Sequence, residues 1–391
     1  MATWRAWMKT GNTAVNAAVQ PRPLGSLQHG LRLRPASLKR RPTVPAAAKS
    51  NDVDQGFSIL TLTNKVFPQG AFVSGVKESW RLAWSLMVKE LAPQDRSGAY
   101  QRPANTFTGV IGSPQFPDEA GRYHVYVGNA CPWCHRVLLA MVLKGMLRPM
   151  PSASGGPQRP SVSFTQLGSD PTKARRGGWI FDPKLGKDPI WGAQDLWEVY
   201  ETASPGFRGR CTAPLLVDAS TRRIVSNESA DIVRMIGASQ MPGTTSVDLY
   251  PSHLRGQIDE LNDKVYRSVN NGVYRSGFST SQQAYDAVQR EMFSTLDDLE
   301  ARLSQSRFLL GDRLTEADIR LLPTISRFDA VYASIFKCNK KRIMDYPNLS
   351  AWLRDMWQIK VDGSSLQVCD TLDIDAARHS YHSSLFPLNP S

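Results

Sequence analysis

The sequence predicts an α/β domain followed by an all-helical domain, and two observations support this order. Between residues 119 and 240, short β-prone runs alternate with apolar stretches that suit helices. From about Pro251 onward, apolar residues recur at helical spacing. A chain of 391 residues is long enough for two compact domains and an extension. We therefore expect a leader over residues 1–50, an N-terminal extension of the first domain over 51–118, the α/β domain over 119–240 and the helical domain over 250–391.

The α/β half begins with a strand, a tight turn, a cysteine and a helix. Residues 123–127 form a β-prone run that Gly128 and Asn129 end. Pro132 lies where a helix can begin, because proline is tolerated in the first helical turn, and apolar residues follow it. Cys131 is thus expected between the turn and the helix.

The following segments complete the α/β half. Residues 161–164 can form the next strand, and residues 214–218 and 223–225 an antiparallel hairpin. The helix expected next has apolar side chains at Ala230, Ile232, Val233 and Ile236. The order βαβ, a helical stretch and then ββα is that of a thioredoxin-like domain. Four prolines and two glycines indicate a surface loop over residues 148–160.

Two long segments of the second half each carry apolar residues along one helical face. In the first, the apolar residues are Ile258, Leu261, Val265, Tyr266 and Val269. In the second, they are Ala284, Val288, Met292, Leu296, Leu299 and Leu303. Residues 315–318 resemble a capping box that opens a further helix, with Asp318 in place of the usual Glu or Gln. In the extension, residues 80–87 give one short helix-like apolar stretch.

The net positive charge is concentrated in the first 50 residues. The chain carries a formal charge of +12, and residues 1–50 hold nine Lys or Arg and no Asp or Glu. Without them, 38 basic and 35 acidic residues remain, so the rest of the chain has little excess charge. An acid-free, Arg-bearing segment of this kind is typical of an organelle transit peptide. The alternative is a basic arm that binds RNA or anionic lipid.

The leader predicts where the protein works. We expect it to direct import into an organelle, a chloroplast rather than a mitochondrion, and to be removed there. Because the charge belongs to the leader, no nucleic-acid partner is expected. No stretch approaches the roughly 18 consecutive apolar residues that a membrane-spanning helix needs, so no membrane span is expected.

Five cysteines, an odd and small number for this length, indicate a reducing compartment rather than a disulfide framework. Cys131 is expected at a helix N-terminus, where unpaired N–H groups and the helix dipole favour a thiolate. Arg136, one turn further along, is a candidate cation beside it. Cys134 lies deeper in the helix, where the backbone donors are already used. The sequence therefore predicts that Cys131 is the nucleophile.

Other interpretations of the Cys131–Cys134 pair stay open. A zinc site would need a second ligand pair, which the sequence lacks, so no metal is expected. The run Cys-Pro-Trp-Cys-His also matches a haem-attachment pattern, although here it follows a β-prone run. A buried structural pair would need no chemistry at all.

An ordered set of segments carries a resemblance to a known family. The segments are residues 122–127 (RYHVYV), 130–133 (ACPW), 178–181 (GWIF), 212–214 (TAP), 226–235 (SNESADIVRM), 269–274 (VNNGVY), 277–278 (GF), 314–320 (LTEADIR) and 327–332 (RFDAVY). With these segments in the family's order, the chain resembles the glutathionyl-hydroquinone reductases, the xi class of glutathione transferases, and the resemblance extends over residues from about 97 to 390. The resemblance implies glutathione as co-substrate, a thioredoxin-like glutathione-binding domain, an all-helical C-terminal domain and a homodimer.

The resemblance also implies which residues bind glutathione. Glu228 and Ser229 match the pair that holds its γ-glutamyl end, although Ser229 could instead only cap its helix. The main chain of Ala213, before a cis bond to Pro214, is expected to pair with the cysteine of glutathione; family members commonly have Val at this position. Trp179 matches a tryptophan that packs on the peptide, although it could equally belong to the core.

Tyr274 and Tyr381 match the hydroquinone-site tyrosines of the family. A phenol hydroxyl can donate a hydrogen bond to the phenolate-like oxygen of the departing product. The chain departs from the family at Cys134, where members commonly have Ala or Ser. Cys134 is either a resolving thiol, which would give glutaredoxin-like dithiol chemistry, or a passive small hydrophobe.

The resemblance therefore implies reduction of glutathionyl-hydroquinones to hydroquinones through a Cys131–glutathione mixed disulfide. One alternative is a dithiol glutaredoxin or an omega-type dehydroascorbate reductase. An alternative of another class is a non-catalytic carrier of hydrophobic ligands.

Overall fold

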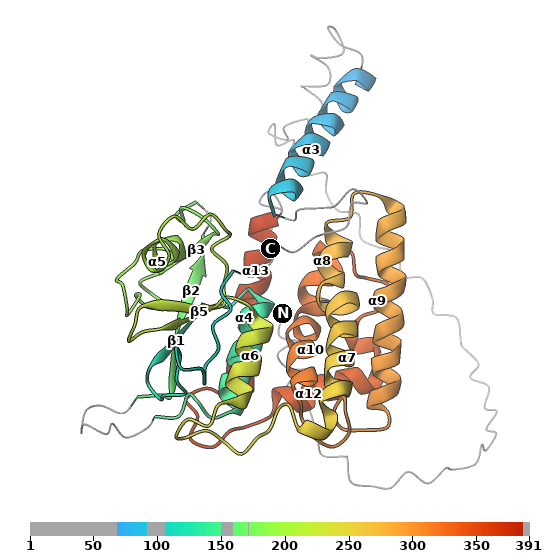
Figure 1. Cartoon of the computed structure of the whole chain (residues 1–391). Helices are drawn as coiled ribbons and strands as arrows, with labels where there is room; N and C mark the ends of the chain where they lie inside the picture. Colours follow the sequence, from blue (N-terminus) through green and yellow to red (C-terminus); the bar gives the residue numbers. More distant parts are fainter. Residues whose placement is uncertain (1–68, 92–105, 150–158, 171, 386–391) are drawn as a thin grey trace, which may run out of the picture. The chain divides into compact units, whose positions relative to one another are not determined.

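The structure is a computed structural model that describes residues 69–91, 106–149, 159–170 and 172–385. The chain divides into two compact units, and the described part of the smaller one is helix α3 (Gln69–Leu91). The larger unit contains an α/β half and a helical half (Figure 1). The predicted leader over residues 1–50 lies outside the described residues.

The α/β half is built on a five-stranded mixed sheet in the order β3-β2-β1-β4-β5. The strands are β1 (Tyr123–Gly128), β2 (Val162–Ser169), β3 (Trp179–Ile180), β4 (Leu215–Asp218) and β5 (Arg223–Ser226). Central β1 runs parallel to β2 and antiparallel to β4. Every residue of β1 and β4 is buried, as expected for strands covered on both faces.

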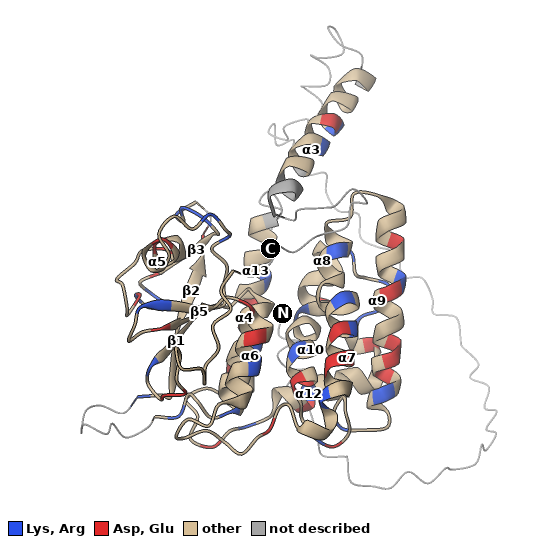
Figure 2. Ribbon diagram, in the orientation of Figure 1, with Lys and Arg blue, Asp and Glu red and all other residues tan. Residues whose placement is uncertain are grey.

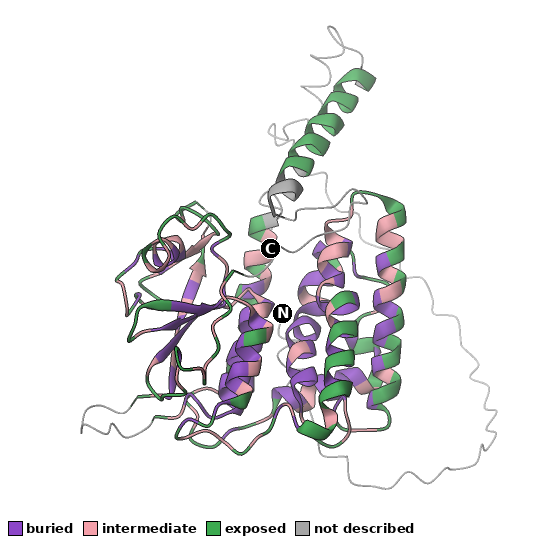
Figure 3. Cartoon of the chain, viewed as in Figure 1, coloured by how far each residue is buried: buried purple, intermediate pink, exposed green. Residues whose placement is uncertain are grey.

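Helices α4 (Pro132–Leu143) and α6 (Ser229–Ala238) lie between the sheet and the helical half, and α5 (Leu196–Ala203) lies on the other side of the sheet (Figure 1). The residues of α4 are buried almost throughout, because this helix packs on the sheet and on α10 (Glu316–Arg327) (Figure 3). The turn before α4 contacts the helical half, because the side chain of Arg327 at the end of α10 donates to the carbonyl of Asn129 at 2.8 Å.

The helical half contains a series of helices and short 3₁₀ or π segments. In chain order they are η1 (Ser252–Leu254), α7 (Arg255–Val265), η2 (Tyr266–Asn270), α8 (Gly272–Gly277), α9 (Gln282–Leu303), α10, η3 (Phe328–Tyr332), α11 (Ala333–Ile335), η4 (Ile343–Asp345), α12 (Pro347–Trp357), η5 (Val368–Asp370) and α13 (Ile374–Leu385). Segments η2 and η3 are single π-turns, which often occur at functional sites. Charges of both signs are interspersed along α7 and α9 (Figure 2).

The expected α/β and all-helical architecture is confirmed. The strands predicted around residues 123–127, 214–218 and 223–225 are β1, β4 and β5, and the expected strand at 161–164 begins at Val162 and is longer. The two-residue strand β3 was not predicted. Residues 150–158 of the predicted loop lie outside the described residues.

The predicted helices of the second half are confirmed, with one local difference. The first apolar face continues from α7 into the π-turn η2, and the second belongs to α9. The capping box is present at α10, where the Asp318 carboxylate accepts from the Thr315 N–H at 3.0 Å. Aspartate can therefore serve where Glu or Gln is usual. The apolar stretch over residues 80–87 lies within α3.

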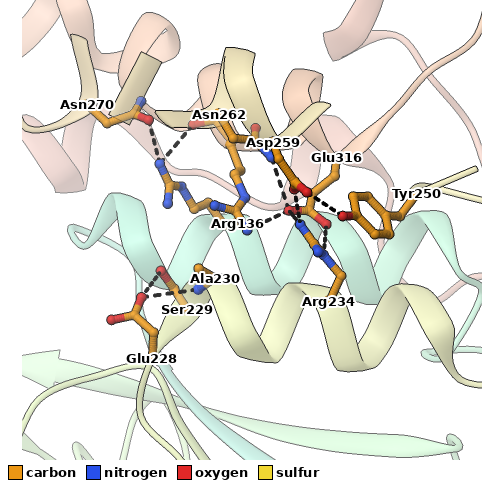
Figure 4. A network of polar contacts seen from close by, with 11 residues as sticks. Arg136, Glu228, Ser229, Ala230, Arg234, Tyr250, Asp259, Asn262, Asn270 and Glu316 are labelled. Atoms are coloured by element: carbon orange, nitrogen blue, oxygen red, sulfur yellow. Dashed lines mark hydrogen bonds and ion pairs between the residues drawn. The ribbon is translucent and has the colours of Figure 1, made fainter. Parts of the chain in front are cut away.

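A polar network joins α6 to the helical half (Figure 4). The Arg234 side chain on α6 donates to the carboxylate of Glu316 on α10 at 2.7 Å and to that of Asp259 on α7 at 3.0 Å. Glu316 is buried, and its charge is balanced by Arg234 and by Arg320 of its own helix. This network fixes α6, and with it the residues at its N-terminus.

Candidate functional site

Cys131 lies where strand β1 gives way to helix α4, as the sequence predicts. It is the N-cap residue of α4, with φ −77° and ψ 117°, and Pro132 is the first helical residue. The N–H of Cys131 donates to the carbonyl of Gly128 at 3.1 Å, which closes the turn. Cys131 is half-buried, whereas Cys134 is buried. Of the two, Cys131 is the sulfur that a ligand can reach.

The surroundings of Cys131 favour its thiolate. Burial raises the pKa of the Cys131 thiol, but several groups that stabilise the thiolate outweigh this effect. These are hydrogen bonds from the Cys134 side chain and from the N–H groups of Cys134 and Trp133, and the charge of Arg327. The net effect lowers the pKa of Cys131 to about 7. Donors at a helix N-terminus act in this way on any anion placed there.

This ionisation predicts a pH dependence. The thiolate forms above the pKa, so the rate at which iodoacetamide alkylates Cys131 should rise with pH and reach half its maximum near pH 7, because the pKa is about 7. An ordinary thiol would give a midpoint near ~8.5. Peptide mapping by mass spectrometry separates Cys131 from the other cysteines. A midpoint above about 8 would contradict the lowered pKa.

The pKa of Cys134 is shifted in the direction opposite to that of Cys131. Burial, and then its hydrogen bond to Cys131, raise the pKa of the Cys134 thiol well above its ordinary value. Its S–H group is therefore retained at neutral pH and donates toward the Cys131 sulfur. No disulfide joins any of the five cysteines, all of which lie in the described residues.

The main chain before Pro214 lies beside the Cys131 sulfur. The Ala213–Pro214 bond is cis, as expected. The Cys131 thiol donates to the carbonyl oxygen of Ala213 at 3.5 Å. Ala213 is buried and contributes only backbone to this contact, so the sequence difference from Val leaves the contact intact. The structure thus brings Cys131, Ala213 and Pro214 together.

Trp179 lies in strand β3, against the end of β1. Its ring occupies the space in front of Gly128, where an added Cβ would come within 2.2 Å of the ring. Only glycine therefore allows this close approach. Trp179 is half-buried and is held next to the turn that precedes Cys131.

Glu228 and Ser229 lie at the N-terminus of α6, directly after strand β5. The N-cap is Glu228, whose carboxylate accepts from the N–H of Ala230 at 3.2 Å (Figure 4). Ser229 is instead the first helical residue and is buried, and its hydroxyl donates to Glu228 at 3.4 Å. The alternative in which Ser229 caps the helix is therefore wrong, because the carboxylate one residue earlier does so.

Tyr274 and Tyr381 meet although 107 residues separate them. Their hydroxyl oxygens are 2.6 Å apart. Tyr332 completes the group, with its hydroxyl 3.5 Å from that of Tyr274 and 3.4 Å from that of Tyr381. Burial is the largest of the effects that raise the pKa of all three phenols, so they stay protonated at neutral pH and can donate. We call Tyr274, Tyr332 and Tyr381 the tyrosine cluster.

Trp133 connects the tyrosine cluster to the Cys131 turn. Its ring stacks on that of Tyr274 at 6.3 Å between centroids and lies 6.0 Å from that of Tyr266. Because Trp133 is only two residues from Cys131, the sulfur and the cluster belong to one site. The charge of Cys131 also acts on Tyr332, whose pKa is raised first by burial and, among smaller effects, by that thiolate.

Sequence reasoning missed three residues of this site. Trp133, Tyr332 and Arg327 all stand inside the segments that carried the family resemblance, so their motifs were the available signal. Arg327 is the cation that acts on the Cys131 thiolate. The side chain of Arg136 donates instead to Asn270 at 2.6 Å and to the carbonyl of Arg320 at 3.2 Å.

Comparison with known proteins agrees with this geometry. Family models for the N-terminal and C-terminal domains of glutathione S-transferase match residues 130–239 and 282–355. Glutathionyl-hydroquinone reductase PcpF of Sphingobium chlorophenolicum is 40 % identical over 325 residues, which cover 82 % of this chain and 94 % of that protein.

Two solved structures are similar in fold and sequence. The glutathione-bound structure of YqjG, a glutathione transferase homologue from Escherichia coli K-12, aligns with a TM-score of 0.62 and 40 % identity over 72 % of this chain and 89 % of that one. The glutathione S-transferase Xi of Phanerochaete chrysosporium aligns with a TM-score of 0.64 and 37 % identity over 74 % and 97 %. The chain therefore belongs to the glutathione transferases and, within them, to the xi-class glutathionyl-hydroquinone reductases.

Proposed function

We propose that the protein reduces glutathionyl-hydroquinones to hydroquinones, with glutathione as the reducing co-substrate. The observation that carries this proposal is the position of Cys131: a thiol with a lowered pKa at a helix N-terminus, 3.5 Å from the Ala213 carbonyl. The tyrosine cluster, linked to the same turn through Trp133, offers hydroxyl donors for the second half of the substrate.

The reaction has two steps. The Cys131 thiolate attacks the glutathione sulfur of the substrate, the bond between that sulfur and the ring carbon breaks, and the ring takes the electron pair and a proton. Cys131 is then joined to glutathione in a mixed disulfide. A second glutathione attacks this disulfide as its thiolate, which releases oxidised glutathione and restores the Cys131 thiolate. No metal takes part.

Glutathione is assigned to the α/β side of the site. A carboxylate suits the α-amino group of the γ-glutamyl residue, so we assign Glu228 to that group. Ser229 and the N-terminal N–H groups of α6 suit its α-carboxylate. The Ala213 main chain beside Pro214 would pair with the cysteine of glutathione, and Trp179 would pack on the peptide.

The hydroquinone is assigned to the tyrosine side of the site. Tyr274 and Tyr381 would donate to the oxygen on which negative charge develops as the ring departs. Because both phenols are protonated at neutral pH, they can donate without first gaining a proton. Trp133 supplies an aromatic face beside Tyr274.

Treatment with glutathionyl-menadiol tests the proposal. We expect menadiol to be released and, when free glutathione is withheld, the intact mass to increase by one glutathione, located on Cys131 by peptide mapping. Added glutathione should then remove the adduct and yield oxidised glutathione. Binding of the compound without release or adduct would instead indicate the ligand-carrier alternative.

The hydrogen bond between the Cys134 and Cys131 side chains is the observation behind the dithiol alternative, and Cys134→Ala tests it. We expect the variant to keep activity on glutathionyl-menadiol within a few-fold, because the protonated, buried Cys134 is a poor attacking thiol. The Cys131 alkylation midpoint should rise slightly, since one donor is lost. Loss of all reductase activity in a folded variant would favour the dithiol mechanism. Dehydroascorbate reduction by the wild type and by Cys134→Ala is measured in the same experiment.

We also propose that the protein is a homodimer that works in a chloroplast after its leader is removed. The family resemblance supports the dimer, and the acid-free, basic composition of residues 1–50 supports import. Sedimentation equilibrium of a chain that starts near residue 50 measures the dimer. A fluorescent protein fused to residues 1–50 reports import, and accumulation in mitochondria would contradict the chloroplast assignment.

A further inference from the structure

Arg327 is a buried cation between helix α10 and the turn that carries Cys131. It ends helix α10, and its side chain is fully buried. Its guanidinium donates to the carbonyl of Asn129 at 2.8 Å, to that of Pro323 at 3.0 Å and to Nδ1 of His135 at 3.0 Å. Its Nε–H is buried without an acceptor among the described residues. All three acceptors are neutral groups.

Three partly exposed arginines lie beside carboxylates, whereas the buried Arg136 donates to Asn270 and to the carbonyl of Arg320. Arg122 pairs with the buried Asp218 at 2.7 Å, and Arg234 and Arg320 share Glu316. Arg327 has no carboxylate within ion-pair distance in the described part of the chain. A buried, unpaired charge is strongly destabilising unless an opposite charge compensates for it. Arg327 therefore requires a counter-charge.

His135 does not supply that counter-charge. Burial, and then the charge of Arg327, hold the pKa of His135 well below its ordinary value, so the imidazole is neutral. Because an arginine only donates, Nδ1 of His135 must accept, and its Nε2–H then donates to the Thr371 hydroxyl at 2.8 Å. Thr371 in turn donates to the carbonyl of Val368 at 2.6 Å. This chain of hydrogen bonds holds the neutral tautomer in place.

The contacts of Arg327 lie on both sides of Cys131. Asn129 is two residues before the cysteine, and His135 is one helical turn after it. The Asn129 side chain also holds the segment before α13, through bonds of 2.8 and 2.9 Å with the main chain of Asp373. One guanidinium therefore connects the turn that projects Cys131 to the helix that follows it.

The backbone after Arg327 directs a second residue to the same site. The π-turn η3 follows immediately, and its i→i+5 hydrogen bond runs from the Ala333 N–H to the Phe328 carbonyl. Tyr332 ends this turn and joins the tyrosine cluster. The charge of Arg327 acts on Tyr332 and Tyr381 as well as on Cys131. Cys131 is the only one of these three whose ionised form is available near neutral pH.

We propose that Arg327 is a positioning residue for the reaction, acting as the buried counter-charge of the Cys131 thiolate and fixing the turn from which this sulfur projects. The inference rests on the proposed function only in that Cys131 is taken as the reacting group. In the resting enzyme the thiolate balances the guanidinium. In the mixed disulfide the Cys131 sulfur carries no charge, so the guanidinium loses its counter-charge. This loss favours attack by the second glutathione and return of the thiolate.

Neutral and charged substitutions at position 327 test the counter-charge. Arg327→Gln keeps donors for the Asn129 carbonyl but loses the charge, and Arg327→Lys keeps the charge. We expect Arg327→Gln to raise the Cys131 alkylation midpoint by about one pH unit and to slow alkylation at pH 7 roughly fivefold. Arg327→Lys should retain a midpoint close to that of the wild type. An unchanged midpoint in folded Arg327→Gln would overturn the proposal.

A matched control separates charge from stability. Arg122→Met removes an arginine at the opposite end of β1 and leaves the buried Asp218 unpaired. This variant should unfold at a lower temperature while keeping the wild-type Cys131 midpoint. If its midpoint rose as much as that of Arg327→Gln, general loosening would explain both results, and the counter-charge would be rejected.

A measurement that keeps Arg327 in place decides the question even if the variants at position 327 do not fold. The ¹⁵N resonances of the Arg327 guanidinium should shift with pH, and the midpoint of this shift should equal the pH at which Cys131 ionises. The shift should vanish in Cys131→Ser. Resonances that do not respond to Cys131 ionisation would contradict the inference. These measurements use no hydroquinone, so failure of the proposed reaction and failure of this inference are distinguishable.

Discussion

Replacing Cys131 by Ser should abolish the reduction of glutathionyl-hydroquinones, with turnover falling by at least ~10³-fold. A serine hydroxyl stays protonated at neutral pH, and its oxygen cannot form the mixed disulfide that the second glutathione resolves. The donors that lower the pKa of Cys131 to about 7 cannot compensate, because an alcohol is far less acidic than a thiol. Menadiol release from glutathionyl-menadiol measures the loss.

Glutathione binding provides the complementary measurement for this variant. Cys131→Ser should bind glutathione with an affinity close to that of the wild type, because the residues assigned to the peptide are unchanged. Cys369→Ser is the matched control. This residue is exposed, and partial burial of its sulfur, followed by the charge of Asp370, raises the pKa of its thiol, so its loss should leave turnover intact. Turnover of Cys131→Ser above about a tenth of the wild-type value would mean that another group is the nucleophile.

The position of the proposed nucleophile, Cys131, could be predicted because it depends on local sequence. A β-prone run, a Gly-Asn turn and a proline in the first helical turn act within ten residues, so they specify where the chain turns and where the helix begins. The structure places Cys131 at that N-cap. The family segments added the tyrosine pair and the bond before Pro214, and the structure brings Tyr274 and Tyr381 to 2.6 Å and shows a cis bond.

The electrostatic partners could not be predicted, because they depend on tertiary contacts. Arg136 is close to Cys131 in sequence but donates to Asn270 and Arg320 in the helical half. Arg327 is 198 residues from Asn129 and still donates to its carbonyl. No periodicity or spacing indicates which arginine reaches the turn, since that depends on how α10 packs on α4.

Two local details were also beyond sequence rules. Serine is a preferred N-cap residue and glutamate is not, which is why capping of α6 was the alternative role for Ser229. In the structure the longer Glu228 side chain folds back to the Ala230 N–H and is reinforced by the Ser229 hydroxyl. The π-turn after Arg327 likewise has no sequence signature, yet it ends at Tyr332, the third member of the tyrosine cluster.

The tyrosine cluster leads to the second large effect: Tyr274→Phe should lower turnover about 10²-fold, while Cys131 alkylation and glutathione binding change little. The hydroxyl is needed only as charge develops on the departing ring, so kcat should fall much more than KM rises. Tyr346→Phe is the matched control, because this buried tyrosine also loses one hydrogen bond, to Asp297, within the helical half. It should reduce stability slightly and leave turnover unchanged.

A double variant separates a shared role from two independent ones. The hydroxyls of Tyr274 and Tyr381 are 2.6 Å apart, so each orients the other, and removal of either should disturb the same donor. Tyr274→Phe/Tyr381→Phe should therefore lose little more turnover than the more damaged single variant, because residues that act as a unit are not additive. If the two losses multiplied instead, the tyrosines would contact different parts of the substrate. If neither single variant lost turnover, the hydroquinone could not be assigned to this side of the site.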